Sequence, residues 1–165
     1  MPTTIDLLLD RDVPHHTPDQ LHGLACALFE GEGAAHSAQE KPFTVWPLRE
    51  ERSGQVLRLT LLADYDQRGR PIPPKLRLGG RFFEVRRRRD EFVPFALLAQ
   101  APARTAAALS FETPTYFSRN GRDLPLPEPT LVFRSLASKW NLHASAELQI
   151  NEQVIRGLLS SIVLN

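Results

Sequence analysis

The stretch TTIDLLLDRDVPHHTPDQLHGLACALF, residues 3–29, contains two hydrophobic periods in succession. Apolar side chains alternate in residues 3–9, which predicts a β-strand with one buried face. The segment TPDQ, residues 17–20, is a capping-box pattern with proline at the first helical position, and leucines follow it at helical spacing. The sequence therefore predicts a strand that leads into a helix over about residues 18–30.

Three further strands follow this helix in the sequence. PFTVWPL at 42–48 and QVLRLTLLA at 55–63 predict an antiparallel pair, and RFFEVRRR at 81–88 predicts another strand. Residues 66–80 contain too many prolines and glycines for a long helix, so we expect at most one short helical turn at 74–78. The predicted order β-α-β-β-(short helix or loop)-β is that of an α+β, ferredoxin-like fold, in which helices cover one sheet face. RNA-recognition domains use the other face, although the fold alone does not establish a function.

The composition restricts the class of protein. The chain has 165 residues, 42% of them hydrophobic and 24% charged, which is typical of a globular protein. Its one cysteine, Cys26, excludes a disulfide framework and a cysteine-based metal cluster within a single chain. The N-terminus carries acids where a signal peptide carries bases, and no apolar run reaches the roughly 20 residues that a membrane span needs. We expect a cytoplasmic protein with no cofactor and no membrane partner.

The net charge of +1 conceals a strong asymmetry along the chain. Residues 1–66 carry a net charge of −6, residues 68–104 carry +7, and residues 105–165 are neutral. The basic segment contains a run of four arginines, Arg86, Arg87, Arg88 and Arg89. One interpretation is an edge strand protected from aggregation by its charges. The other is a surface that binds phosphates, since arginine forks match phosphate oxygens.

A second unit follows a linker of small residues at 101–108. LSFETPTYF at 109–117 predicts a strand, NGRD at 120–123 predicts a tight turn, and a helix follows the prolines after it. Trp140 continues the apolar stripe of this helix, which favours a core position over a base-stacking role. We therefore divide the chain into domains of residues 1–104 and 105–165.

Two separated motifs carry a family resemblance. LSFETPTYFSRNGRDLPLPEPTLVFRSLASKWN, residues 109–141, resembles the signature of the CRISPR-associated pre-crRNA-processing endoribonucleases of the RAMP superfamily, the sixth Cas protein family. In that signature, a strand ending in a Ser/Thr-Pro-Thr step is followed by a proline-rich turn and a helix that closes on Trp-Asn. The helix at 21–29, His36 and the segment KPFTVWPL resemble the family's helix, histidine and strand in the same order. The matched stretches cover most of residues 15–48 and 109–141.

The resemblance implies two ferredoxin-like domains in tandem and cleavage of CRISPR repeat RNA without metal. Residues 105–165 then form an incomplete second ferredoxin-like domain, because the glycine-rich loop that the family carries near its end does not occur here. We accordingly expect a C-terminally truncated or shortened relative. The expected partner is CRISPR repeat RNA, and other subunits of a CRISPR effector complex or a second copy of the chain are further candidates.

RNA cleavage without metal needs a proton acceptor, a proton donor and a cation near the phosphorane. The 2′-hydroxyl attacks the adjacent phosphate and leaves a 2′,3′-cyclic phosphate and a 5′-hydroxyl. Histidine suits the proton transfer because its unperturbed pKa is about 6.5, and lysine supplies the cation. The resemblance implies that His36 and Lys41 are the family's catalytic histidine and lysine, whereas spacing alone leaves His36 open as an ordinary loop residue. Cys26 stands where some members have a tyrosine, and its apolar neighbours favour a small buried hydrophobe over a nucleophile.

Three functions remain open at this stage. The first is an endoribonuclease of antiviral defence, with His36 and Lys41 as catalytic residues and the four arginines as RNA-binding residues. The second is a catalytically silent RAMP module that binds CRISPR RNA as a scaffold, and the third is an unrelated ferredoxin-like domain. His15, His16 and His22 have no convincing carboxylate partner at ligand spacing, so we do not expect a metal site.

Overall fold

The structure is a computed structural model with two compact units, Met1–Pro94 and Phe95–Asn165. It describes residues 2–13, 16–30, 41–62, 71–104, 106–109, 117–119, 122–124 and 128–162. The division at residues 94 and 95 lies ten residues before the domain boundary predicted at 104 and 105. That two-domain assignment stays a prediction, and each unit is described by itself.

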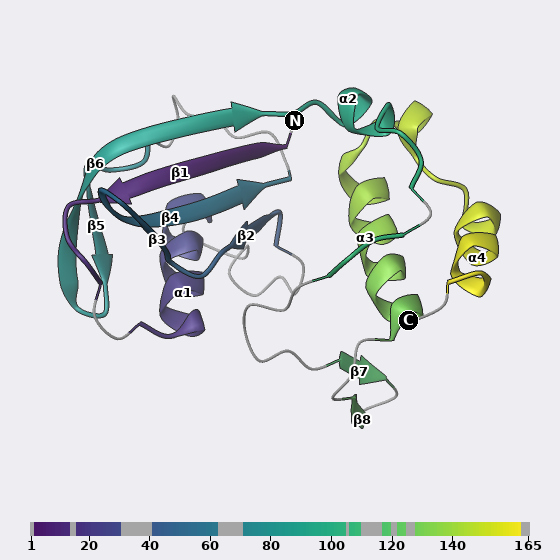
Figure 1. Cartoon of the computed structure of the whole chain (residues 1–165), viewed down its shortest axis with the longest axis horizontal. Helices are drawn as coiled ribbons and strands as arrows, with labels where there is room; N and C mark the ends of the chain where they lie inside the picture. The colour runs from purple at the N-terminus through teal and green to yellow at the C-terminus, as the bar shows by residue number, and fades with distance from the viewer. Residues whose placement is uncertain are drawn as a thin grey trace. The chain divides into compact units, whose positions relative to one another are not determined.

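The first unit is an antiparallel sheet with helix α1 on one face (Figure 1). Its elements are β1 (Thr3–Leu9), α1 (Pro18–Phe29), β2 (Phe43–Val45), β3 (Arg49–Glu51), β4 (Gly54–Leu61), β5 (Lys75–Leu78) and β6 (Arg81–Phe92). The strand order is β2-β4-β1-β6-β5, and β3 also pairs with β4. The first strand thus lies between β4 and β6, which is the arrangement of a ferredoxin-like fold. The predicted α+β fold is confirmed.

Helix α1 begins at the predicted capping box. The Gln20 backbone N–H donates to Thr17 Oγ1 at 3.3 Å, and the Thr17 backbone N–H donates to Gln20 Oε1 at 3.1 Å. These two bonds satisfy donors that a helix start otherwise leaves without a partner. The local sequence alone therefore determines where α1 starts.

The core lies between α1 and the sheet. Ile5 of β1 is paired with Leu59 of β4, and Leu7 with Leu57, and all four side chains are fully buried. They pack with the buried residues of α1, which are Leu21, Leu24, Ala25 and Cys26. Burial of each such leucine or isoleucine contributes about 1.5–3 kcal/mol. A shift of register by one residue would send these side chains to the opposite face, so the core fixes which face each β1 residue occupies.

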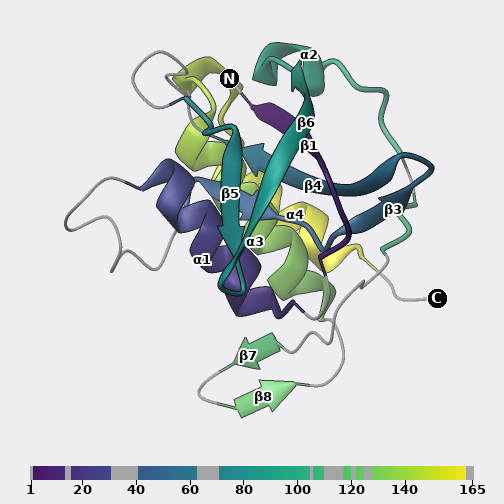
Figure 2. The same cartoon turned by 90° about the vertical axis from the view of Figure 1, so that its left-hand side faces the viewer.

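The helical turn expected at residues 74–78 is wrong, because this segment forms strand β5. Lys75 to Leu78 pair with residues 81–84 of β6 across a tight turn, and β5 lies beside β6 at the sheet edge (Figure 2). Gly79 and Gly80 form the turn with φ of +56° and +81°, a conformation that side chains with a Cβ rarely adopt. The prolines precede the strand and do not interrupt it. The proline and glycine content of residues 66–80 as a whole does not indicate this position.

The second unit is largely helical in the residues that the structure describes. It contains α2 (Phe95–Ala99), the hairpin β7 (Phe117–Arg119) and β8 (Arg122–Leu124), α3 (Pro129–His143), the short 3-10 helix η2 (Ala146–Leu148) and α4 (Glu152–Ser160). The hairpin agrees with the predicted turn, although residues 120 and 121 lie outside the described residues, as does most of the predicted strand at 109–117. None of the described helices is long and apolar enough to cross a membrane.

Trp140 and Asn141 hold the segment that follows α3. Trp140 packs edge-on against Phe95 at 5.1 Å between ring centroids, and its Nε1–H donates to the Leu148 carbonyl at 2.8 Å. The Asn141 side chain donates to the Ile150 carbonyl at 2.8 Å and accepts from the Ile150 N–H at 2.7 Å. The structural role predicted for Trp140 is thus confirmed.

Candidate functional site

Of the two predicted catalytic residues, only Lys41 lies in the described part of the chain. His36 lies within residues 31–40, outside the described residues, so its predicted role stays a prediction. Lys41 is described, and its Nζ forms an ion pair with Oε1 of Glu30. The side chains are only 13% and 6% exposed, so this is a buried pair in which each charge requires the other.

Glu30 occupies the C-cap position of α1. Its backbone N–H donates to the Cys26 carbonyl at 2.8 Å, which closes the last helical turn. A carboxylate at this end meets the negative pole of the helix dipole, and the structure shows no basic residue in the last turn of α1. The Lys41 ammonium offsets the burial of the Glu30 charge and its unfavourable interaction with the helix dipole. The ion pair in turn holds that ammonium at the C-terminal end of α1.

Two more polar side chains continue along the same side of α1. His22, Cys26 and Glu30 follow one another at intervals of four residues, which places them on one helix face. Cys26 Sγ lies 3.4 Å from His22 Nε2, and burial, together with the Glu30 charge and hydrogen bond, raises the pKa of the Cys26 thiol. The thiol therefore stays protonated, in keeping with the predicted buried hydrophobe. Among the described residues, no group of three or more His, Cys, Asp or Glu side chains is arranged to hold a metal ion.

The four arginines of β6 do not share one face of the sheet. Leu8 of β1 is paired with Arg87 and Leu9 with Val85, so a bulge leaves Arg86 between two consecutive pairs. Arg88 is paired with the core residue Leu7 and donates two hydrogen bonds of 2.7 Å to Asp90. Arg87 and Arg89 lie on the opposite face, away from α1.

Arg87 and Arg89 meet two arginines from other strands on the sheet face opposite α1, which we call the outer face. A hollow of about 110 Å³ lies here. The outer face is lined by Asp6, Leu8, Arg49, Glu51, Val56, Arg58, Arg87 and Arg89. These eight residues come from β1, β3, β4 and β6. A cluster of guanidinium groups on one surface is suited to bind phosphate.

Asp6 and Arg58 form a bidentate ion pair on the outer face. Nε and a terminal guanidinium nitrogen of Arg58 donate to the two carboxylate oxygens of Asp6, each at 2.7 Å. The hydrogen bond from Arg58, with the charges of Arg58, Arg49 and Arg89, holds the pKa of Asp6 below its ordinary value. The bidentate bond also fixes the plane of the Arg58 guanidinium.

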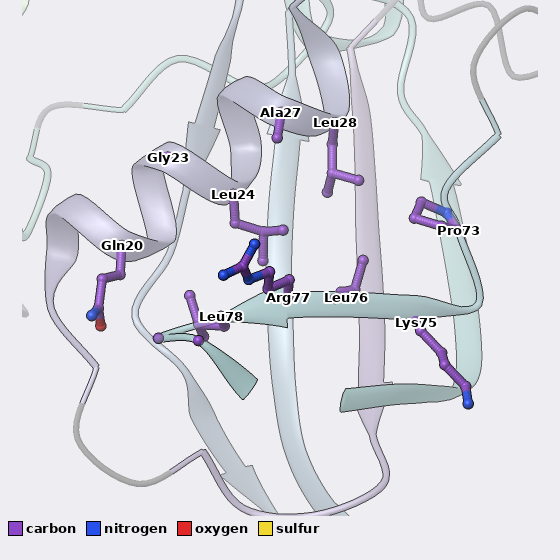
Figure 3. A pocket seen from close by; sticks show the side chains of 12 residues that line it. Gln20, Gly23, Leu24, Ala27, Leu28, Pro73, Lys75, Leu76, Arg77 and Leu78 are labelled. Carbon is purple, nitrogen blue, oxygen red and sulfur yellow. The ribbon is translucent and has the colours of Figure 1, made fainter. Parts of the chain in front are cut away.

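A larger groove of about 440 Å³ lies between α1 and β5 (Figure 3). Leu24 and Leu28 of α1 line it together with Leu76 and Leu78 of β5. Arg77 reaches into the groove below Leu24, whereas Lys75 points away from it. Its described lining contains no histidine or carboxylate, so this lining is suited to hold an apolar group and lacks the usual side chains for proton transfer.

Comparisons with known proteins agree in both sequence and fold. The family model described as CRISPR-associated endoribonuclease Cas6 matches residues 109–164. A solved structure of a Cas6 product complex has 26% sequence identity and a TM-score of 0.75, over 97% of this chain and 71% of that chain. The chain is thus similar to Cas6 endoribonucleases, in sequence over residues 109–164 and in fold over almost its whole length. No curated protein sequence matches it.

This similarity to the CRISPR-associated endoribonuclease Cas6 confirms the resemblance predicted from the sequence motifs. The family match includes Trp140 and Asn141, whose hydrogen bonds connect α3 to the segment before α4. In this chain, the Trp-Asn pair therefore has a structural role that its described contacts explain.

Three residues of the candidate site were not predicted from the sequence. Glu30 ends the helix, and its position eleven residues before Lys41 in the chain gave no sign of an ion pair. Arg49 and Arg58 lie outside the basic segment, in the acidic first third of the chain. Strict alternation along 55–61 could have placed Arg58 opposite the apolar face, but its pairing with Asp6 depends on the register between β4 and β1.

Proposed function

We propose that this chain is a metal-independent endoribonuclease that cleaves CRISPR repeat RNA in antiviral defence. The 2′-hydroxyl attacks the adjacent phosphate, and the products carry a 2′,3′-cyclic phosphate and a 5′-hydroxyl. The observation that carries the proposal is the match to the Cas6 family in both sequence and fold. The proposed partner is repeat RNA, and other effector subunits or a second copy of the chain remain candidates.

His36 and Lys41 are the proposed catalytic residues. His36 transfers a proton between the reacting oxygens, and the Lys41 ammonium stabilises the negative charge that develops on the phosphorane. An ammonium group has three N–H donors. The ion pair with Glu30 holds this ammonium at the C-terminal end of α1. The support for Lys41 is that this pair fixes its position; the support for His36 is the family resemblance.

Phosphate binding is assigned to the predicted run of Arg86, Arg87, Arg88 and Arg89, with unequal roles for its members. Arg87 and Arg89 lie on the outer face with Arg49 and Arg58, where four guanidinium groups can contact the RNA backbone. Arg88 is engaged by Asp90 on the other face, so we expect its contribution to RNA affinity to be small.

Cleavage of a cognate repeat RNA in excess EDTA tests the catalytic proposal. We expect the wild-type chain to cut at one position and His36→Ala or Lys41→Ala to lower the rate by about 10²–10⁴-fold. End analysis should find a cyclic phosphate and a 5′-hydroxyl. His143→Ala, in the last turn of α3, is the matched control and should cut normally. Equal rates for wild type and His36→Ala would make the catalytic assignment wrong.

A charge exchange separates the chemical role of Lys41 from its structural role. The double variant Glu30→Lys, Lys41→Glu retains an ion pair of opposite orientation, and we expect it to recover much of the stability that either single variant loses. It should nevertheless not cleave RNA, because a carboxylate replaces the ammonium. Recovery of cleavage together with stability would show that the pair is purely structural.

The alternative function is a catalytically silent module that binds CRISPR RNA as a scaffold. It is favoured by Cys26 at the position of the family's tyrosine, because this thiol is buried and held protonated. A wild-type chain that binds repeat RNA in a salt-dependent manner but leaves it uncut, with or without divalent cations, would establish this alternative.

A further inference from the structure

An exposed tryptophan extends the outer face beyond its arginines. Trp46 directly follows β2, and its N–H donates to the Arg58 carbonyl at 3.0 Å. Thr44 is paired with Thr60 in the β2–β4 register, so this bond continues the register and places Trp46 opposite Arg58. Trp46 is therefore on the outer face, and it is 48% exposed.

The strand registers place Trp46 in a row that crosses the sheet. Arg58 of β4 is paired with Asp6 of β1, which is paired in turn with Arg89 of β6. The row thus reads Trp46, Arg58, Asp6, Arg89. Neighbouring strands lie about 4.8 Å apart, so this row spans about 14 Å. Arg87 lies two residues from Arg89 along β6 and on the same face.

The chemistry of this row matches an unpaired nucleic-acid strand. Every base has a flat face that can stack on tryptophan, and every nucleotide carries a phosphate that arginine can bind. A base within a duplex is already stacked and cannot offer its face to a side chain. Asp6 holds the Arg58 guanidinium in a fixed plane beside Trp46, so part of the surface is ordered before a ligand arrives.

We propose that the outer face binds a single-stranded segment of RNA, with one base stacked on Trp46 and the adjoining phosphates on Arg58, Arg87 and Arg89. This inference rests on the proposed function in taking RNA as the ligand. It adds a contact to unpaired RNA on the sheet face opposite the Lys41–Glu30 pair and the rest of α1. The net charge of the row and its flanking arginines is positive, which complements the negative charge of a nucleic-acid backbone.

Tryptophan fluorescence of the full chain in EDTA tests the proposal. The chain has two tryptophans, so the signal of Trp46 is the difference between wild type and Trp46→Phe. The probes are an eight-nucleotide oligo(A) RNA, the same oligomer with abasic sites, and a blunt RNA duplex of equal length. We expect oligo(A) to quench Trp46, and the abasic oligomer and the duplex to quench it weakly.

Affinity variants supply the second measurement. Trp46→Ala should bind oligo(A) roughly tenfold more weakly or worse, whereas Trp46→Phe should retain most of the affinity because phenylalanine also stacks. Phe92→Ala is the matched control: Phe92 is 52% exposed on the same sheet but is paired with Thr3 on the face of the core residues. Its affinity should equal that of the wild type.

Three results would overturn the proposal. They are equal affinities of wild type and Trp46→Ala for oligo(A), equal Trp46 quenching by duplex and single strand, and protection of Trp46 from acrylamide before RNA is added. The last result would show that protein covers this surface. Because the probe experiment does not require cleavage, failure of repeat cleavage with intact Trp46 quenching would refute the proposed catalytic function and leave this site standing.

Discussion

The two faces of the β1–β4–β6 sheet show how one stretch of sequence acquires two roles. On the α1 face, Arg88 is paired with the buried residue Leu7 of β1, and it donates two hydrogen bonds to Asp90. On the outer face, its neighbours Arg87 and Arg89 join Arg58 around an ordered carboxylate. Alternation along a strand sends adjacent residues to opposite faces. A run of like charges in sequence is therefore not one patch in space.

Two Lys–Glu ion pairs show a second contrast, between a buried pair and an exposed one. Lys41 and Glu30 are almost completely buried, whereas Lys75 and Glu84 form a 3.1 Å pair with side chains that are 63% and 58% exposed. The chemical groups are identical, but water can replace either partner of the exposed pair. Burial determines how much each pair matters.

The largest expected effect separates these two pairs. Glu30→Gln leaves the Lys41 ammonium without its buried counter-charge and should lower the free energy of unfolding by about 3–5 kcal/mol. Glu84→Gln removes an exposed partner and should change it by less than about 1 kcal/mol. Urea unfolding of the full chain measures both. Similar small losses in the two variants would contradict the buried position of Lys41.

The next effect separates neighbouring arginines by face. The double variant Arg87→Ala, Arg89→Ala should weaken RNA binding and reduce the slope of log affinity against log salt by about 1.5, since two phosphate contacts are lost. Arg88→Ala should leave that slope unchanged and lower the free energy of unfolding by about 1–2 kcal/mol, because Asp90 loses two charge-assisted bonds. Equal slopes for Arg88→Ala and the double variant would show that the two sheet faces do not differ in RNA binding.

A smaller effect tests the ordered carboxylate of the outer face. Because Arg58 lowers the pKa of Asp6 below 3.8 in the folded chain, the pair stabilises the fold above the unfolded pKa, and this contribution is lost as the pH falls through the folded value. Asp6→Asn should therefore lower the free energy of unfolding by about 1 kcal/mol at pH 7. The difference from wild type should shrink as the pH falls below 3.8 and vanish once Asp6 is protonated in the folded chain. A difference that stays constant with pH would show that ionisation of Asp6 is not involved.

The smallest effect concerns the thiol on the α1 face. The folded pKa of Cys26 is raised above 9.0, so its contribution is complete below pH 9 and is lost as the pH rises through the folded value. Between pH 8.5 and 10.5, wild-type stability should decline more steeply than that of Cys26→Ala, with a divergence of about 1 kcal/mol or less. Parallel declines would indicate that the thiol does not titrate differently in the fold.

Local patterns predicted the elements that local physics controls. The capping box fixed the start of α1, and alternating leucines identified β1 and β4 with their buried faces. The helical turn predicted at residues 74–78 was wrong because the prolines and glycines of this region have separate roles. The prolines precede β5, whereas Gly79 and Gly80 form the turn after it. The dipeptide Gly79-Gly80 before an alternating strand was the signal that could have found the hairpin.

The sequence by itself determined the ferredoxin-like order of elements, the resemblance to Cas6 and the basic segment, because periodicity, capping and motif order are properties of neighbouring residues. Tertiary structure decided which groups meet: Glu30 with Lys41, and Asp6 with Arg58. It also decided that Trp46 shares a sheet face with Arg58. Those contacts depend on strand register and on where α1 ends against the sheet. Such relations are set by burial of the whole core, and no local pattern encodes them.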